Sequence, residues 1–348
     1  MASLTRYPIS RDRFELFYES LWANVGTFNL EPLHIHRLPL LFIIIAIATL
    51  TASPLVLRLD PLSTRAVMTD KRIQQANEFF GASRRSAAYL DGLLSVRGDI
   101  MLVMSDLLTV RYLILVRRAP DAQPHLGSAI ARAQACGLHR NSRATGATEG
   151  KDDQERRLVW SYVYHMDRYF SLLLGKPLAI SDHTSDAELP MNLDAFGVLV
   201  PPQQVTLNSF LIYRDKLAHI MGQVSSEVFT LADSPYEAVE RIEEDMQSWA
   251  QSLPPQLAVT PPVEDDASPL VLKIHRRFLS TEFNFARISL HRPYLARPDP
   301  ADRFNRSRDA CLDAAIDDLT IRSISHVHGM ENLSTGSYRI ANSIIILG

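Results

Sequence analysis

The chain has 348 residues, of which 46 % are hydrophobic and 22 % charged, and its net charge at pH 7 is −3. These proportions are typical of a globular chain with a sizeable core. A dedicated nucleic-acid binder gathers Lys and Arg in a patch, whereas here they come as scattered pairs, so a DNA-contacting surface is disfavoured. Cys136 and Cys311 are too few for a disulfide framework or a structural zinc site, which fits a reducing compartment.

Helical periodicity runs through most of the chain, and no segment has the strict alternation of a half-buried strand. We predict helices over residues 11–23, 38–53, 69–91, 98–117, 121–136, 152–175, 205–230, 234–252, 269–290 and 307–321. Proline-rich composition predicts a long loop at 176–204 and an extended linker at 253–269. The expected fold class is all-α, a large multi-helix bundle in two lobes joined by loops, with no significant β-sheet. The expected domains are a lead-in segment, 1–30, and one large domain, 31–348.

The uncharged segment 38–57 is a candidate membrane span. Pro39 is expected in the first turn of its helix, and Pro54 is expected to break that helix. The piece between them is about 15 residues, or roughly 22 Å long. A hydrocarbon core needs roughly 30 Å. We therefore predict a fully buried core helix without membrane contact; a membrane-anchored protein is the alternative.

Several helix ends carry local signals. Ser234-Pro235-Tyr236-Glu237 offers a serine cap, a proline at the first helical position and a glutamate that can close a capping box. Gly137 and Gly175 are expected to terminate helices in the left-handed conformation. Two acid–arginine pairs at four-residue spacing are expected at the start of the helix at 152–175, namely Asp152–Arg156 and Asp153–Arg157.

The search for catalytic motifs is negative. The sequence has no G-x-S-x-G elbow, Walker loop or dinucleotide-binding fingerprint. His34 and His36 could supply two metal ligands, but zinc needs three or four that converge. The remaining histidines of interest are isolated in sequence and are expected at helix ends or on the surface: His139, His165 and His183.

A row of aspartates is the strongest argument for an enzyme. Asp309, Asp313 and Asp317 recur at four-residue spacing, with Asp318 adjacent, so their carboxylates could share one helix face. Magnesium is bound by such oxygen ligands, and an all-α isoprenoid-synthase-like site is conceivable. A second cluster on a facing helix is missing. We therefore predict no enzyme and no catalytic, metal, cofactor-binding or DNA-contact residue; a magnesium-dependent enzyme using Asp313 and Asp317 is the alternative.

Another set of segments has no catalytic meaning but recurs in a characteristic order. It comprises Ala129–Arg140, Glu155–Tyr162, Asp167–Ser171, Gly175–Asp182, Asp186 with Leu189 and Pro190, Trp249 with Ser252–Pro255, His291–Leu295 and Cys311–Ala315. Together they resemble the fungal-specific transcription factor domain, also called the middle homology region. The resemblance covers roughly residues 15 to 325 and is strongest from 126 to 190. His183 and Ser185 depart from the family pattern.

The resemblance implies structural roles for its signature residues. These are Gly137, Leu138, His139, Arg157, Trp160, Asp167, Arg168, Gly175, Pro177, Asp182, Pro190, His291, Arg292 and Pro293. Asp167 and Arg168 are adjacent on one helix and are not expected to face each other. Each is expected to tie that helix to a different neighbour, one of which could be the loop at 176–190.

The resemblance further implies a nuclear transcription regulator whose regulatory domain is residues 31–348. Family members carry an N-terminal six-cysteine zinc cluster that reads DNA, but residues 1–30 contain no cysteine. Zinc is therefore expected only in that missing cluster, and DNA is expected to be reached indirectly. The implied partners are a second copy, an intact zinc-cluster factor or the transcription machinery, with a small-molecule effector as a further option. A truncated factor and a co-regulator both fit.

Overall fold

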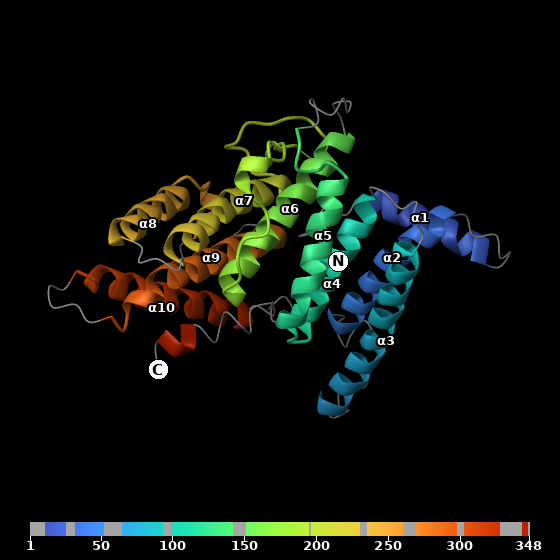
Figure 1. Cartoon of the computed structure of the whole chain (residues 1–348), viewed down its shortest axis with the longest axis horizontal. Coiled ribbons are helices and arrows are strands. Elements are labelled where there is room, and N and C mark those ends of the chain that lie inside the picture. The colour runs from blue at the N-terminus through green and yellow to red at the C-terminus, as the bar shows by residue number, and fades with distance from the viewer. Residues whose placement is uncertain are drawn as a thin grey trace. The chain divides into compact units, whose positions relative to one another are not determined.

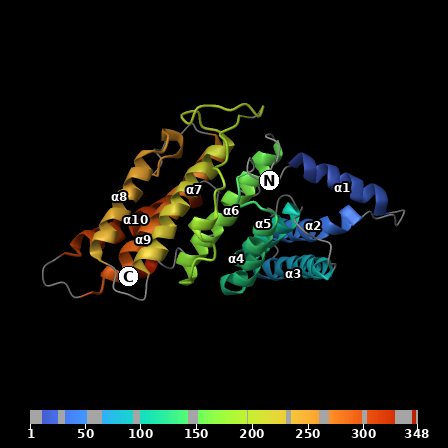
Figure 2. The same cartoon turned by 45° about the horizontal axis from the view of Figure 1, so that its top comes forward.

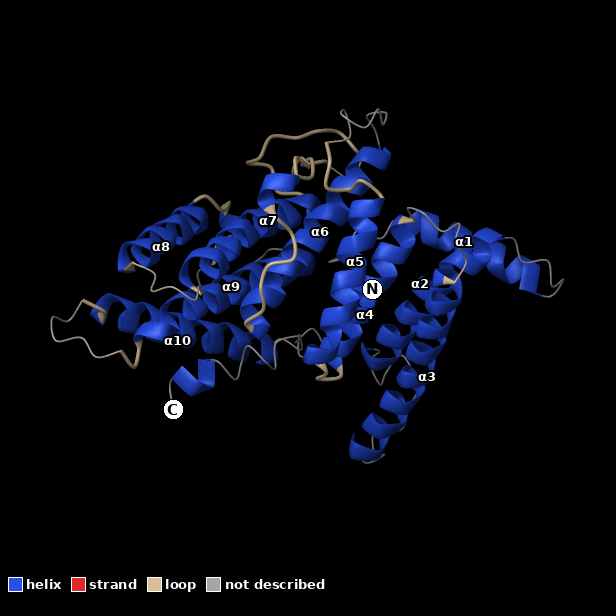
Figure 3. Cartoon of the chain, viewed as in Figure 1, coloured by secondary structure: helices blue, strands red, loops and turns tan. Residues whose placement is uncertain are grey.

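The structure is a computed structural model that describes residues 11–25, 32–51, 65–92, 99–141, 151–194, 196–229, 235–259, 269–297, 303–327 and 343–346. Within these ranges the regular elements are helices (Figure 3), and the β-type pairing is a single antiparallel bridge between Leu193 and Leu199. The predicted all-α fold is confirmed. The chain forms two compact units: an N-terminal unit, Ser3–Val163 with Ser185–Ala187, and a C-terminal unit, Tyr164–Thr184 with Glu188–Gly348.

The N-terminal unit is built around α4. Its helices are α1 (Arg11–Val25), α2 (Pro32–Thr51), α3 (Arg65–Asp91), α4 (Ile100–Leu115), α5 (Gln123–Ala135) and the first half of α6 (Lys151–Leu174). Asp99 caps α4 by accepting the Met101 amide at 2.8 Å. Every residue of α4 from Leu102 to Ile114 is buried, and α4 packs on both α2 and α5 (Figure 1).

One buried carboxylate in α4 fastens the neighbouring helices. The Asp106 carboxylate accepts a hydrogen bond from Arg84 of α3 at 3.2 Å. It also accepts one from Ser128 of α5 at 2.8 Å and one from Arg132 of α5 at 2.9 Å. A buried carboxylate without such partners would be strongly destabilising. Asp106 therefore fixes how α3 and α5 pack on α4.

Helix α2 corrects two of the predictions. It begins at Pro32 and contains Pro39 in its interior, because Leu38 packs with Leu41 against Phe17 of α1 and supports the turn before the proline. Only 39 % of the residues from His34 to Thr51 are buried, so α2 is not the fully buried helix we predicted. By length and composition alone this helix could cross a membrane, which is weak evidence because the core helices of soluble proteins pass the same test.

The C-terminal unit surrounds α9. Its helices are the second half of α6, α7 (Leu207–Gln223, continued by a π-helical turn, Val224–Val228), α8 (Tyr236–Gln251), α9 (Leu270–His291) and α10 (Asn305–Val327). Helix α9 contacts α7, α8 and α10 (Figure 2), and its middle is buried almost without interruption. The chain passes from one unit to the other inside the continuous helix α6, which the sequence did not predict, and also within the loop after α6, on either side of Ser185–Ala187.

The two helix ends that we predicted from a glycine are confirmed. Gly137 and Gly175 have φ of 67° and 61°, as predicted. Helix α8 begins at Tyr236 with Pro235 in the cap position, one residue later than predicted, and the predicted cap residue, Ser234, lies outside the described residues. A capping box that we did not predict starts α7, formed by Thr206 and Ser209.

Candidate functional site: the buried Arg168 cluster

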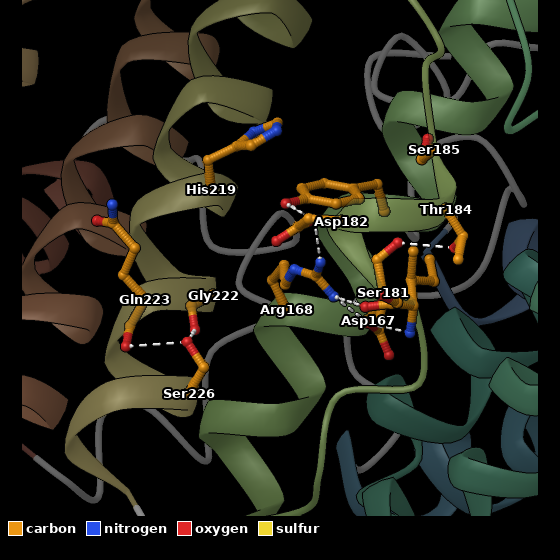
Figure 4. Close-up of polar contacts among 12 residues, drawn as sticks. Asp167, Arg168, Ser181, Asp182, Thr184, Ser185, His219, Gly222, Gln223 and Ser226 are labelled. Carbon is orange, nitrogen blue, oxygen red and sulfur yellow. Dashed lines mark hydrogen bonds and ion pairs between the residues drawn. The ribbon is translucent and has the colours of Figure 1, made fainter.

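Arg168, in the second half of α6, is a completely buried arginine. Its Nη1 atom donates to Asp167 Oδ2 at 2.5 Å and to the Ile180 carbonyl at 2.9 Å, and its Nη2 atom donates to Asp182 Oδ1 at 2.5 Å (Figure 4). A buried guanidinium is tolerated only when paired and hydrogen-bonded in this way. Arg168 therefore joins α6 to the loop that follows it.

Asp167 binds the same loop from its backbone side. Its two carboxylate oxygens accept the amides of Ala179 and Ile180 at 3.0 and 3.1 Å. Burial raises the pKa of Asp167, although the two amides and Arg168 act in the opposite direction. The predicted contact with the loop at 176–190 is confirmed.

Two details of that prediction are wrong. Asp167 and Arg168 bind each other, and both bind the same stretch of chain instead of different neighbours. Neighbouring residues diverge on a helix surface, but a guanidinium at the end of a long stem can turn back to a carboxylate that is held beside the same loop.

Tyr164, one turn before Arg168, completes the cluster. Its ring lies under the guanidinium at 4.2 Å, and its hydroxyl donates to Asp182 Oδ1 at 2.8 Å. Burial, the largest cause, raises the pKa of the Tyr164 hydroxyl, so it stays a donor at neutral pH. Its ring also contacts that of His219 in α7 at 4.5 Å.

Gly222 lets α7 approach the cluster closely. A β-carbon at this position would lie 3.0 Å from Arg168 Nε and 3.2 Å from its Cδ. Nearby, the Ser171 hydroxyl donates to the Lys176 carbonyl at 2.6 Å, and its oxygen lies 3.0 Å from Ser225 Oγ, which can donate to it. Sequence reasoning missed Tyr164, Ser171, His219 and Gly222; a glycine in the interior of a predicted helix was the one available signal.

The signature residues of the N-terminal unit fall in a different set of contacts. The His139 and Trp160 rings lie 5.9 Å apart, and Arg157 pairs with Asp153 at 2.8 Å, as predicted. Arg156 donates to the carbonyls of Cys136 and Gly137 and so caps the end of α5. Leu138 is buried.

Loop residue Asp186 belongs to the same unit. It receives the forked guanidinium of Arg140 at 2.8 and 3.2 Å, and the Asn141 amide at 2.9 Å. The hydrogen bond from Arg140 lowers the pKa of this exposed carboxylate.

A second buried network links α8, α9 and α10. Glu243 of α8 pairs with Arg287 at 2.8 Å and with His291 Nε2 at 3.1 Å, both on α9. His291 Nδ1 in turn lies 2.9 Å from Ser307 Oγ of α10, which also bonds the Tyr236 hydroxyl at 2.8 Å. The signature residue His291 thus has a structural role in this network, while Arg292 and Pro293 begin the short 3₁₀ turn that follows α9.

Sequence reasoning missed Glu243, although a signal existed. This acid lies on the same helix stripe as the buried residues Val239, Ile242 and Met246. A carboxylate on an apolar stripe is rare without a partner.

The aspartates of the row differ in their surroundings. Asp309 and Asp313 are exposed, whereas Asp318 is buried and bound by Arg322 at 2.8 and 2.9 Å and by Ser343 at 2.8 Å. Burial and the nearby Asp313 raise the pKa of Asp317. In the part of the chain that the structure describes, no group of three or more His, Cys, Asp or Glu side chains could hold a metal ion.

The histidines also show no metal-binding arrangement. His34 is buried in α2 and bonds Ser20 Oγ at 2.9 Å, while His36 is half-buried. His139 follows the end of α5 and His183 is exposed, as predicted. His165 is not on the surface as expected: it is buried and lies 3.0 Å from Glu282 Oε2, because α9 packs over this part of α6.

The described residues are all-α, and the Arg168 cluster lies within the signature block on which the family resemblance is strongest. The sequence profile of the fungal specific transcription factor domain matches residues 15–259, which is more than half of the chain. The chain therefore belongs to this family. No solved structure is significantly similar to it.

Its relatives are named as regulators of transcription. An uncharacterized transcriptional regulatory protein of Schizosaccharomyces pombe is 27 % identical over 71 % of this chain and 32 % of its own length. Activator of stress genes 1 of Saccharomyces cerevisiae is 25 % identical over 69 % of this chain and 26 % of its own. A Zn(2)-C6 fungal-type transcription factor of Macrophomina phaseolina is 24 % identical over 55 % of this chain and 27 % of its own length. The chain spans about a third or less of these relatives.

Proposed function

We propose that this chain is the regulatory region of a fungal zinc-cluster-type transcription regulator that acts in the nucleus. The observation that carries the proposal is the family match over residues 15–259, together with relatives named as transcriptional regulators, one of them a Zn(2)-C6 factor. The names of these relatives are those of regulators and not of enzymes.

The two polar clusters have a structural role in the C-terminal unit. Arg168 has no exposed surface, and the Glu243 carboxylate is bound by Arg287 and His291. Their hydrogen bonds are used to join helices and loops of the C-terminal unit. Such buried polar networks specify one arrangement of packed elements, as a domain that presents a defined surface to partners requires.

The proposal extends to partners and cofactors. With a net charge of −3, we expect the chain to reach DNA indirectly, through a second copy, an intact zinc-cluster factor or the transcription machinery. We expect zinc only in a separate cysteine cluster, and a small-molecule effector would act by favouring one arrangement of the helices.

A reporter assay tests the proposal. The chain is fused to an unrelated DNA-binding domain and compared with that domain alone at equal nuclear abundance. We expect the fusion to raise or lower reporter transcription. An Arg168→Leu fusion, in which the C-terminal unit should be destabilised, serves as the control and should lose the effect. Identical output from the fusion and the DNA-binding domain alone would show that the proposal is wrong.

A further inference from the structure

A short segment of the loop after α6, Ser185–Ala187, is fastened to the end of α5, and we call it the strap. It belongs to the N-terminal unit. The Ser185 hydroxyl and the Asp186 amide both donate to the His139 carbonyl, each at 3.1 Å. The hydroxyl of Ser185 therefore helps to hold the strap in place.

The other bonds of the strap lie at the surface. The Asp186 carboxylate pairs with Arg140, and the two side chains are 48 % and 51 % exposed. The same carboxylate accepts the Asn141 amide at 2.9 Å. Segments held by solvent-exposed hydrogen bonds open at a low free energy. The strap can therefore leave the end of α5 while the rest of the unit stays folded.

The strap carries an acidic sequence pattern. Ser185 is followed by Asp186, Ala187 and Glu188, and it is the one Ser or Thr in the sequence with an acid both one and three positions after it. No Lys or Arg occurs from 177 to 213. Protein kinases select substrates partly by charge pattern, so a kinase with a basic substrate groove fits this segment.

The acids of the strap are bound in the folded chain, which sets the order of events. Asp186 is held by Arg140, and the exposed Glu188 takes part in an interaction of its own. A kinase binds its substrate as an extended segment and exchanges these contacts for its own. It therefore captures the open form of the strap.

We propose that Ser185 is a phosphorylation site and that its modification releases the strap. An acidophilic protein kinase transfers the γ-phosphoryl group of ATP to Ser185. The Oγ–phosphorus bond forms, the bond from the γ-phosphorus to the ADP oxygen breaks, and the hydroxyl proton passes to the catalytic base of the kinase. The inference goes beyond the proposed function, and none of its tests uses transcription.

The phosphate prevents the strap from closing. Ser185 loses the hydrogen that it donates to the His139 carbonyl, and a charge of about −1.5 to −2 is placed beside that carbonyl and Asp186. Burial and the nearby Arg140 lower the pKa of His139, so its ring is not a cation that could bind the phosphate at neutral pH. Arg140 uses Nε and Nη2 for Asp186, so a phosphate that binds it competes with that contact.

The first test locates the acceptor in the folded chain. The purified chain is incubated with ATP and casein kinase 2, an acidophilic kinase, and the modified residue is identified by tandem mass spectrometry. We expect phosphate on Ser185 and none at this position in Ser185→Ala. Thr184→Ala, which removes the exposed hydroxyl next to it, should be modified as fast as the wild type. A chain that is unmodified at Ser185, or modified there only after denaturation, would overturn the proposal.

A second test asks whether opening precedes the transfer. Arg140→Gln removes the partner of Asp186 and should speed phosphorylation of Ser185 by about two- to fivefold, the range expected for an exposed ion pair. The matched control is Arg118→Gln, which removes an exposed guanidinium from its pair with Asp121 in the same unit and should leave the rate unchanged. Equal rates in both variants and the wild type would contradict the proposed opening.

Amide hydrogen exchange measures the release itself. In the phosphorylated chain, the Asp186 and Asn141 amides should exchange at least about fivefold faster than in the unmodified chain, as expected for the loss of one hydrogen bond. The control is the Leu138 amide, which bonds the Ala133 carbonyl at 3.0 Å and should not change. Slower exchange at Asp186 would mean that the phosphate clamps the strap to Arg140. That result, or unchanged exchange, would overturn the proposal.

Discussion

At the scale of single residues, burial decides which charged pairs matter. The Arg140–Asp186 and Arg168–Asp182 pairs both join a helix or its end to the loop after α6. The first has both side chains about half exposed, so solvent screens it. Asp182 is 58 % exposed, but Arg168 is inaccessible to solvent, so loss of Arg168 leaves the buried Asp167 carboxylate without its guanidinium partner.

Replacing Arg168 by leucine should be strongly destabilising. The change leaves buried Asp167 and the Ile180 carbonyl without their guanidinium partner, and such losses cost about 3–5 kcal/mol. The check is a lowered urea midpoint of the C-terminal unit. Arg241→Leu, which removes a guanidinium from pairs in which both partners are more than one-third exposed, is the control and should leave the midpoint almost unchanged. An Arg168→Leu variant as stable as the wild type would refute this account of the cluster.

Replacing Gly222 by alanine should also destabilise, by about 1–3 kcal/mol, because the new methyl group would lie 3.0 Å from a guanidinium that cannot move away. The matched control is Gly127→Ala in α5, where a β-carbon meets nothing within 4 Å. That change should stabilise by about 0.5–1 kcal/mol through helix propensity. Thermal unfolding of both variants measures the change in melting temperature. Changes of the same sign in Gly222→Ala and Gly127→Ala would contradict the steric argument.

At the scale of helices, buried polar networks determine which elements pack together. Hydrophobic stripes bring α8, α9 and α10 into contact, but they allow sliding. Glu243, Arg287, His291 and Ser307 permit one register, because each needs its partner at hydrogen-bonding distance.

The α8–α9–α10 network should make stability depend on acid. Burial raises the pKa of Glu243, but the hydrogen bond with His291 and the charge of Arg287 together lower it below its ordinary 4.5. Since the folded pKa lies below the unfolded one, this stabilisation is present above pH 4.5 and is lost as the pH falls through the folded pKa.

Glu243→Gln should therefore lower the free energy of unfolding by about 1–3 kcal/mol at neutral pH. The difference from the wild type should shrink as the pH falls below 4.5. Urea unfolding at pH values above and below 4.5 measures this difference in the free energy of unfolding. The control is Glu244→Gln, which changes an exposed neighbour of Glu243 on α8. A difference that is constant with pH would show that the charge of Glu243 is not what stabilises the network.

At the scale of the whole chain, the balance of charge bears on whether the protein binds DNA. With 36 basic and 39 acidic side chains and a net charge of −3, it has no excess of cations to neutralise phosphates. Family membership does not by itself imply contact with DNA, so this balance of charge supports a specific expectation.

The purified chain should not bind duplex DNA in a sequence-dependent way at about 0.15 M salt. A mobility-shift assay against a pool of random duplexes, followed by sequencing of any retained DNA, checks this. Enrichment of a motif would mean that a basic surface forms in spite of the scattered sequence pattern.

Much of the fold could be predicted because its signals are local. Periodicity placed most described helices within a few residues, and Gly137 and Gly175 ended theirs as expected. The start of α2 was missed because packing on α1 overrides the effect of Pro39. The start of α8 was placed one residue early because several residues near it could have begun the helix.

The sequence by itself determined the fold class, the family and the segment in which the main cluster lies, because each depends on spacing along the chain. Only the tertiary structure decided which side chains meet. Arg168 with Asp182 and Glu243 with His291 are separated by 14 and 48 residues. Spacing along the chain does not state which elements become neighbours, and these pairs form only where the packed elements bring both side chains within hydrogen-bonding distance.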